Sequence, residues 1–143
     1  MADQRYIKFI EYIISLTKQA EISWKYLDSN KALYESMHWV TEGEEKWSLL
    51  GNRTVLYPEF NREESFYVGI NDANVVLLVR NSEPASMYVV PYTYKKVVQL
   101  DADEYGEYIT RLHNLVESQF PDGETFIDNL LAQNDEADNN QHG

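Results

Sequence analysis

The chain of 143 residues contains no cysteine, so neither a disulfide framework nor a thiolate metal site can form. Its six glycines never cluster, which excludes the glycine-rich loops that hold phosphates in P-loop and dinucleotide-binding proteins. The longest uninterrupted apolar run covers residues 75–79, far short of the roughly 20 residues that a membrane-spanning helix needs. We therefore expect a cytoplasmic protein that has no membrane association, no cofactor and no metal ion.

Signatures of catalysis are missing as well. The three histidines, His38, His113 and His142, do not have the spacing of metal ligands, and no Gly-x-Ser-x-Gly elbow occurs. Basic residues are scattered, and Lys95 and Lys96 are the only adjacent pair, which disfavours direct nucleic-acid binding. The sequence therefore predicts a protein that is not an enzyme and does not bind nucleic acid directly.

Negative charge is what the chain has in excess. It holds 24 acidic residues against 12 Lys and Arg, a formal net charge of −12. Residues 1–100 are near neutral, with thirteen carboxylates against eleven bases, whereas residues 101–143 hold eleven carboxylates and a single base, Arg111. Because summed surface charge attracts partners of opposite sign and repels those of like sign, this regional acidity favours a basic protein partner.

The spacing of apolar residues predicts an α+β fold. Helical periodicity predicts a first helix over residues 6–17, capped by Asp3, and a long helix that begins after Asp101. Between them, alternating residues and turn residues predict antiparallel strands over residues 65–70, 75–79, 87–92 and 97–100. We expect an N-terminal helix, a central antiparallel meander of three to five strands, and C-terminal helices that pack on one face of the sheet.

A shorter second helix is predicted near the C-terminus. Asp122 is positioned to cap it. Beyond residue 131 the sequence is polar and acidic, with almost no apolar content. We therefore expect one α+β domain over residues 1–131 and a disordered acidic tail over residues 132–143. The apolar side of the predicted helix consists of Phe126, Ile127, Leu130 and Leu131.

The N-terminal region carries a resemblance. Its pattern Phe9-x-x-x-Ile13-x-x-Leu16-Thr17-Lys18-x-x-x-Ile22-x-Trp24 resembles the start of small uncharacterised α+β accessory proteins of bacteria and their phages. In those proteins a helix that ends near such a Thr leads to an Ile-x-Trp segment, a meander and a final helix. By analogy alone, the resemblance implies a bacterial or phage accessory protein with a non-enzymatic role.

Two acidic groups form the candidate partner-binding surface. One crowds the start of the predicted long helix, and the other follows the predicted cap of the last helix. The first hypothesis is an acidic interaction domain that binds or inhibits a basic protein, in the manner of immunity or phage anti-defence proteins or of a nucleic-acid mimic. The competing interpretation is that these carboxylates only stabilise helix starts and keep the domain soluble. The candidate residues are Asp101, Asp103, Glu104, Glu107, Tyr108, Glu124 and Asp128.

Two other classes of function stay open. One is a small-molecule-binding protein or enzyme with a site between the sheet and the helices, near His113 or His38. The other is a structural or oligomerising module that uses the strand edge ending at Pro91. The sequence leaves the partner, the ligand and the oligomeric state undetermined.

Overall fold

The computed structural model describes residues 2–37, 40, 45–47, 53–55 and 59–142. Its two longest packed helices are α1 (Gln4–Lys18) and α3 (Ala102–Glu117). Both begin at the aspartates expected from the sequence: Asp3 accepts the backbone N–H of Arg5, and Asp101 accepts that of Glu104. The side-chain caps satisfy donors that the first helical turn leaves without intrahelical partners.

A five-stranded antiparallel sheet lies between these helices in the sequence. Its strands are β1 (Lys25–Tyr26), β4 (Phe66–Ile70), β5 (Ala73–Leu78), β6 (Ser86–Pro91) and β7 (Val98–Leu100), and they are arranged in this order. The hairpin of β4 and β5 turns through Asn71 and Asp72, and Asn71 takes a positive φ of 53° that Asn tolerates better than most residues. The predicted meander is therefore confirmed, with β1 added at its edge.

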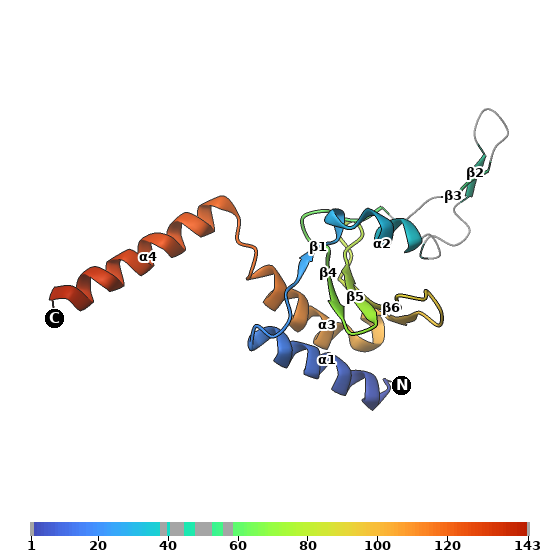
Figure 1. The fold of residues 1–143 in the computed structure, drawn as a ribbon, viewed down its shortest axis with the longest axis horizontal. Helices are drawn as coiled ribbons and strands as arrows, with labels where there is room; N and C mark the ends of the chain where they lie inside the picture. Colours follow the sequence, from blue (N-terminus) through green and yellow to red (C-terminus); the bar gives the residue numbers. More distant parts are fainter. Residues whose placement is uncertain (1, 38–39, 41–44, 48–52, 56–58, 143) are drawn as a thin grey trace.

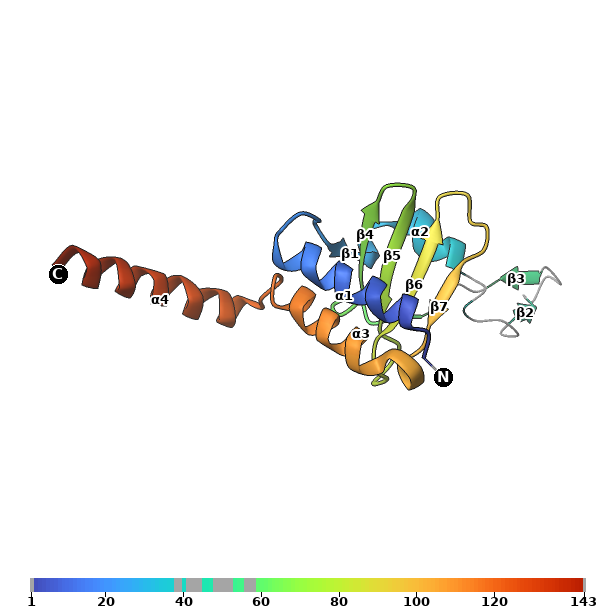
Figure 2. The same cartoon turned by 90° about the horizontal axis from the view of Figure 1, so that it is seen from below.

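Helices cover both faces of the sheet (Figure 2). Alternate residues of β5 explain why: Val75 and Leu77 pack against α1 and α3, whereas Val76 and Leu78 pack in a second core. That second core lies against the short helices η1 (Leu27–Ser29) and α2 (Lys31–Ser36). A strand buried on both faces has a continuous apolar sequence instead of an alternating one, and residues 75–79 have this pattern.

The predicted α+β class, with an N-terminal helix, an antiparallel sheet and C-terminal helices, is confirmed. Of the C-terminal helices, α3 packs beside α1 on the sheet, while α4 (Gly123–His142) extends away from the body of the domain (Figures 1 and 2). The helix α4 includes residues 132–142, for which the sequence predicts disorder. Two further strands, β2 (Glu45–Trp47) and β3 (Arg53–Val55), form a separate two-stranded antiparallel sheet.

Candidate functional site

A groove with a volume of about 790 Å³ lies where the end of α3, the start of α4, β1 and the segment before β4 meet. This volume is within the range of about 300–1,000 Å³ that ligand sites occupy. Four of its lining residues are carboxylates: Glu63, Glu64, Glu117 and Asp122. None of the described residues that line it is Lys or Arg, so we refer to it as the acidic groove.

Three aromatic rings line the same groove and contact one another. The ring centroids of Tyr26 and Phe66 are 5.2 Å apart, those of Phe66 and Phe120 are 5.1 Å apart, and those of Tyr26 and Phe120 are 4.8 Å apart. Phe66 is fully buried, whereas Tyr26 is 37% exposed and Phe120 is half-buried. The accessible parts of Tyr26 and Phe120 thus lie beside carboxylates, and both aromatic rings and carboxylates attract cations.

His113 joins α3 to the segment that carries two of these carboxylates. Its Nε2 lies 2.7 Å from the carbonyl oxygen of Glu64, and because a carbonyl only accepts, this nitrogen carries the hydrogen and donates. Its Nδ1 lies 3.1 Å from Oε1 of Glu117. The His113 side chain is 10% exposed, so the buried ring supports the backbone of Glu64 and the carboxylate of Glu117 and does not itself line the groove.

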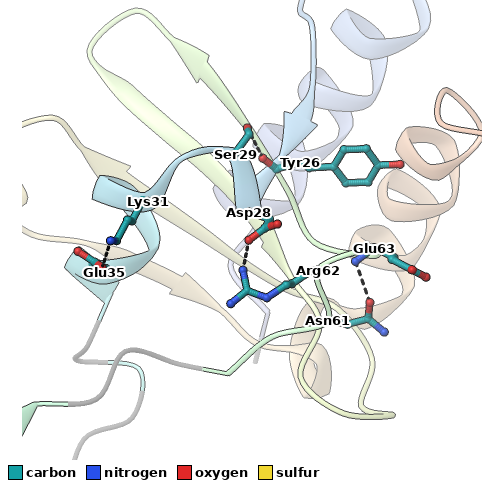
Figure 3. A network of polar contacts seen from close by, with 8 residues as sticks. All are labelled: Tyr26, Asp28, Ser29, Lys31, Glu35, Asn61, Arg62 and Glu63. Atoms are coloured by element: carbon teal, nitrogen blue, oxygen red, sulfur yellow. Dashed lines mark hydrogen bonds and ion pairs between the residues drawn. The ribbon is translucent and has the colours of Figure 1, made fainter.

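The wall that carries Tyr26 and Glu63 is fixed by a polar network (Figure 3). Arg62 pairs with Asp28 of η1, which follows β1, and the side chain of Asn61 accepts the backbone N–H of Glu63 at 3.0 Å. The guanidinium of Arg62 is thus held by Asp28, while the Tyr26 ring points away from this pair. The network holds the nearby positive charge of Arg62 outside the groove lining.

Asp122 forms the boundary between the groove and α4. Its carboxylate accepts the backbone N–H of Thr125 at 2.8 Å, as the cap predicted from the sequence would. Hydrogen bonds from the Thr125 backbone and side chain lower the pKa of Asp122 below its ordinary value of 3.8. The group is therefore negatively charged at neutral pH and contributes to the groove's potential.

The structure separates the partner-binding residues predicted from the sequence into two groups. Two of them, Glu124 and Asp128, lie on α4, which follows the C-terminal end of α3. The other five lie at the start of α3: Asp101, Asp103, Glu104, Glu107 and Tyr108. With 16 residues and a rise of about 1.5 Å per residue, α3 is about 24 Å long. The two predicted acidic groups are therefore not parts of one contact surface the size of a groove.

Several members of the first group have local structural partners. Asp101 caps α3, the Glu107 carboxylate lies 3.6 Å from Arg111, and Tyr108 is half-buried against the core with Arg111 over its ring. Asp103 lies in the first turn, where the helix dipole stabilises a carboxylate. On α4, Glu124 and Asp128 are exposed. Neither of these two predicted partner-binding residues lines the acidic groove.

Most of the groove was missed by sequence reasoning. Its residues come from distant parts of the sequence, so no single motif contains them. They are Tyr26 at the end of β1, Glu63 and Glu64 before β4, and Glu117 and Phe120 at and after the end of α3. Asp122 alone carried a local signal, because a capping residue is recognisable from its neighbours. His38, one of the histidines named for an alternative site, lies outside the described residues.

Comparisons with protein-family models, with curated proteins and with solved structures give no match to this chain. The resemblance to bacterial and phage accessory proteins therefore stays a prediction. Within the part of the chain that the structure describes, no helix combines the length and the hydropathy needed to cross a membrane. In the same part, no three side chains of His, Cys, Asp or Glu are grouped in a way that would hold a metal ion.

Proposed function

We propose that this chain is a non-enzymatic interaction domain whose acidic groove binds a basic segment of a protein partner. The observation that supports the proposal is the combination of four carboxylates and two accessible aromatic rings in one concavity, with no basic residue among its described lining. Lys and Arg side chains are the protein groups that satisfy both features, because they pair with carboxylates and bind over aromatic faces.

The groove supports this proposal better than the start of α3 does. Its carboxylates come from three separate segments and converge on one concave surface, as polar groups in binding sites do. Carboxylates at both places have local partners, because Asp101 and Asp122 both cap helices, Glu107 pairs with Arg111 and Glu117 contacts His113. The groove differs in that its carboxylates stand beside aromatic rings in one concavity. Occupation of the groove would inhibit any partner that uses the same basic segment for its own activity.

The test uses a short peptide of alternating Arg and Ser, and a Gln/Ser peptide of equal length as the neutral probe. We expect the Arg/Ser peptide to bind at low salt and to dissociate at about 0.5 M salt, where the Debye length falls to a few ångström. The variant E63Q/D122N removes two exposed groove charges, and Asn at position 122 still caps α4. It should weaken binding by about tenfold, close to 1.4 kcal/mol.

The matched control is D103N/E104Q, which removes the same amount of charge from exposed positions at the start of α3. We expect it to change the affinity by less than about threefold, because exposed charges further away than a Debye length are screened. Equal losses in the two variants would show that only net charge matters. Equal binding of the Gln/Ser peptide would show that the groove does not select a basic ligand, and either result contradicts the proposal.

A further inference from the structure

An apolar stripe on α4 is exposed in this structure. Phe126, Ile127, Leu130 and Leu131 are between 54% and 57% exposed, although such residues are normally buried. Their spacing places them together on one side of the helix. Four large apolar side chains that are adjacent on one helix form a continuous patch, and such patches mark interaction surfaces.

The stripe faces away from the rest of the domain. Thr125 and Asn129 of the same helix line the acidic groove. Successive helix residues are turned by about 100°, so the stripe lies on the side of α4 opposite to these two residues. Figures 1 and 2 both show α4 extending away from the sheet and from the other helices. The stripe is therefore available to another molecule without rearrangement of the domain.

Charge identifies the kind of molecule. Residues 123–142 hold five carboxylates and neither Lys nor Arg, and Glu124 and Asp128 lie beside the stripe. Helices that pack together have axes about 8–10 Å apart, so pairing with a second copy of α4 would bring these like charges together. Anionic lipid is disfavoured for the same reason, because helices that lie on such membranes carry Lys and Arg beside their apolar face.

We propose that the apolar stripe of α4 inserts into an apolar cleft of a partner protein that is bordered by Lys or Arg side chains. This is recognition of a helix in a groove, in which the apolar residues provide affinity and the flanking carboxylates provide orientation and specificity. The inference goes beyond the proposed function, because the partner's positive charge follows from Glu124 and Asp128, and the contact lies on the opposite side of α4 from the acidic groove.

The test uses a synthetic amphipathic helix with Leu on one face and Lys on its flanks as the probe. Two control peptides accompany it: one has Ser in place of Leu, and the other has Glu in place of Lys. We expect only the Leu/Lys peptide to bind through the stripe. The variant I127Q/L131Q keeps helix propensity because Gln is a good helix former, and it should weaken this binding by about tenfold or more.

The matched control is Y12Q/A132Q, which introduces the same residue type at two exposed positions that belong neither to the stripe nor to the acidic groove. It should bind the Leu/Lys peptide within about threefold of the wild-type affinity, because these positions do not belong to the stripe. Circular dichroism of each variant confirms that the helix content is unchanged. The peptides are also compared on E63Q/D122N, in which binding of Lys side chains to the acidic groove is weakened. Equal losses in the two variants, or equal binding of the Ser/Lys and Leu/Lys peptides to E63Q/D122N, would overturn the inference.

Other occupants give distinct results. A dimer in sedimentation equilibrium that I127Q/L131Q converts to a monomer would identify a second copy as the occupant and overturn the inference. Binding to phosphatidylcholine vesicles that this variant abolishes would overturn it in favour of a lipid surface. If the Arg/Ser peptide fails to bind but the Leu/Lys peptide binds through the stripe, the groove's proposed function fails and the inference stands. If only the Arg/Ser peptide binds, the proposed function of the groove stands and the inference about the stripe fails.

Discussion

A buried hydrogen bond between Thr17 and Trp24 should measurably stabilise the fold. The hydroxyl of Thr17 donates to the carbonyl of Ile13 at 2.8 Å and accepts the indole N–H of Trp24 at 3.0 Å. Thr17 is 1% exposed and Trp24 is 4% exposed, so water cannot replace either partner. Because Trp24 directly precedes β1, this bond also anchors the strand that carries Tyr26 to the groove.

The perturbation is T17V, which replaces the hydroxyl by a methyl group of similar size and leaves the indole N–H of Trp24 without an acceptor. An unsatisfied buried donor costs about 1–3 kcal/mol, and we expect a loss of about 2 kcal/mol in the free energy of unfolding. For a chain of this length that corresponds to a fall in Tm of roughly 4–8 °C. T17S keeps the hydroxyl and should lose only about 0.8 kcal/mol, the contribution of one buried methyl group.

Urea unfolding monitored by far-UV circular dichroism measures these losses in a double-mutant cycle with W24F, which removes the donor. In the W24F background, T17V leaves no buried N–H group without an acceptor, so we expect a coupling energy of about 1–2 kcal/mol. The cycle cancels the loss of packing that W24F itself causes. Additivity of the two substitutions to within about 0.5 kcal/mol, or equal losses for T17V and T17S, would refute the reasoning.

Two pH-dependent predictions follow from the ionisable groups. Burial raises the pKa of Tyr88 above its ordinary value of 10.0, so the native state keeps a proton that the unfolded chain releases. Stability should therefore fall as the pH rises above 10.0, and Y88F should reduce this fall in urea midpoints measured across that range. The pKa of Asp122 is lowered, so its stabilisation of α4 is present above pH 3.8 and is lost as the pH falls through the lowered value. An NMR titration of the Asp122 carboxyl that gives an ordinary pKa would contradict this.

Local patterns predicted most of the secondary structure. The helices α1 and α3 begin at Asp3 and Asp101 because a capping side chain and the apolar spacing that follows it lie within a few residues of each other. The β4–β5 hairpin was predictable for a similar reason, since Asn71 and Asp72 form a turn between two strand-like runs. Such signals depend on neighbours in the sequence, so a single sequence is enough to recognise them.

Local sequence cannot decide which of the predicted C-terminal helices covers the sheet. The sequence contains two apolar helical stripes near its end, and periodicity alone gives both the same interpretation. In the structure Tyr105, Ile109 and Leu112 of α3 are buried, whereas Leu130 and Leu131 of α4 are more than half exposed. A stripe is buried only if the chain places it against another apolar surface. The turn after α3 decides this for α4, so the outcome is a property of the tertiary structure.

By itself, the sequence determined the class of fold, the helix caps, the hairpin and the net charge of −12, because these depend on composition and on neighbouring residues. The tertiary structure alone decided that Tyr26, Glu64 and Phe120 meet in an acidic groove, and that the early group of predicted acidic residues lies at the other end of α3. The physical reason is that chain folding joins residues far apart in sequence, and no local pattern specifies which of them come together.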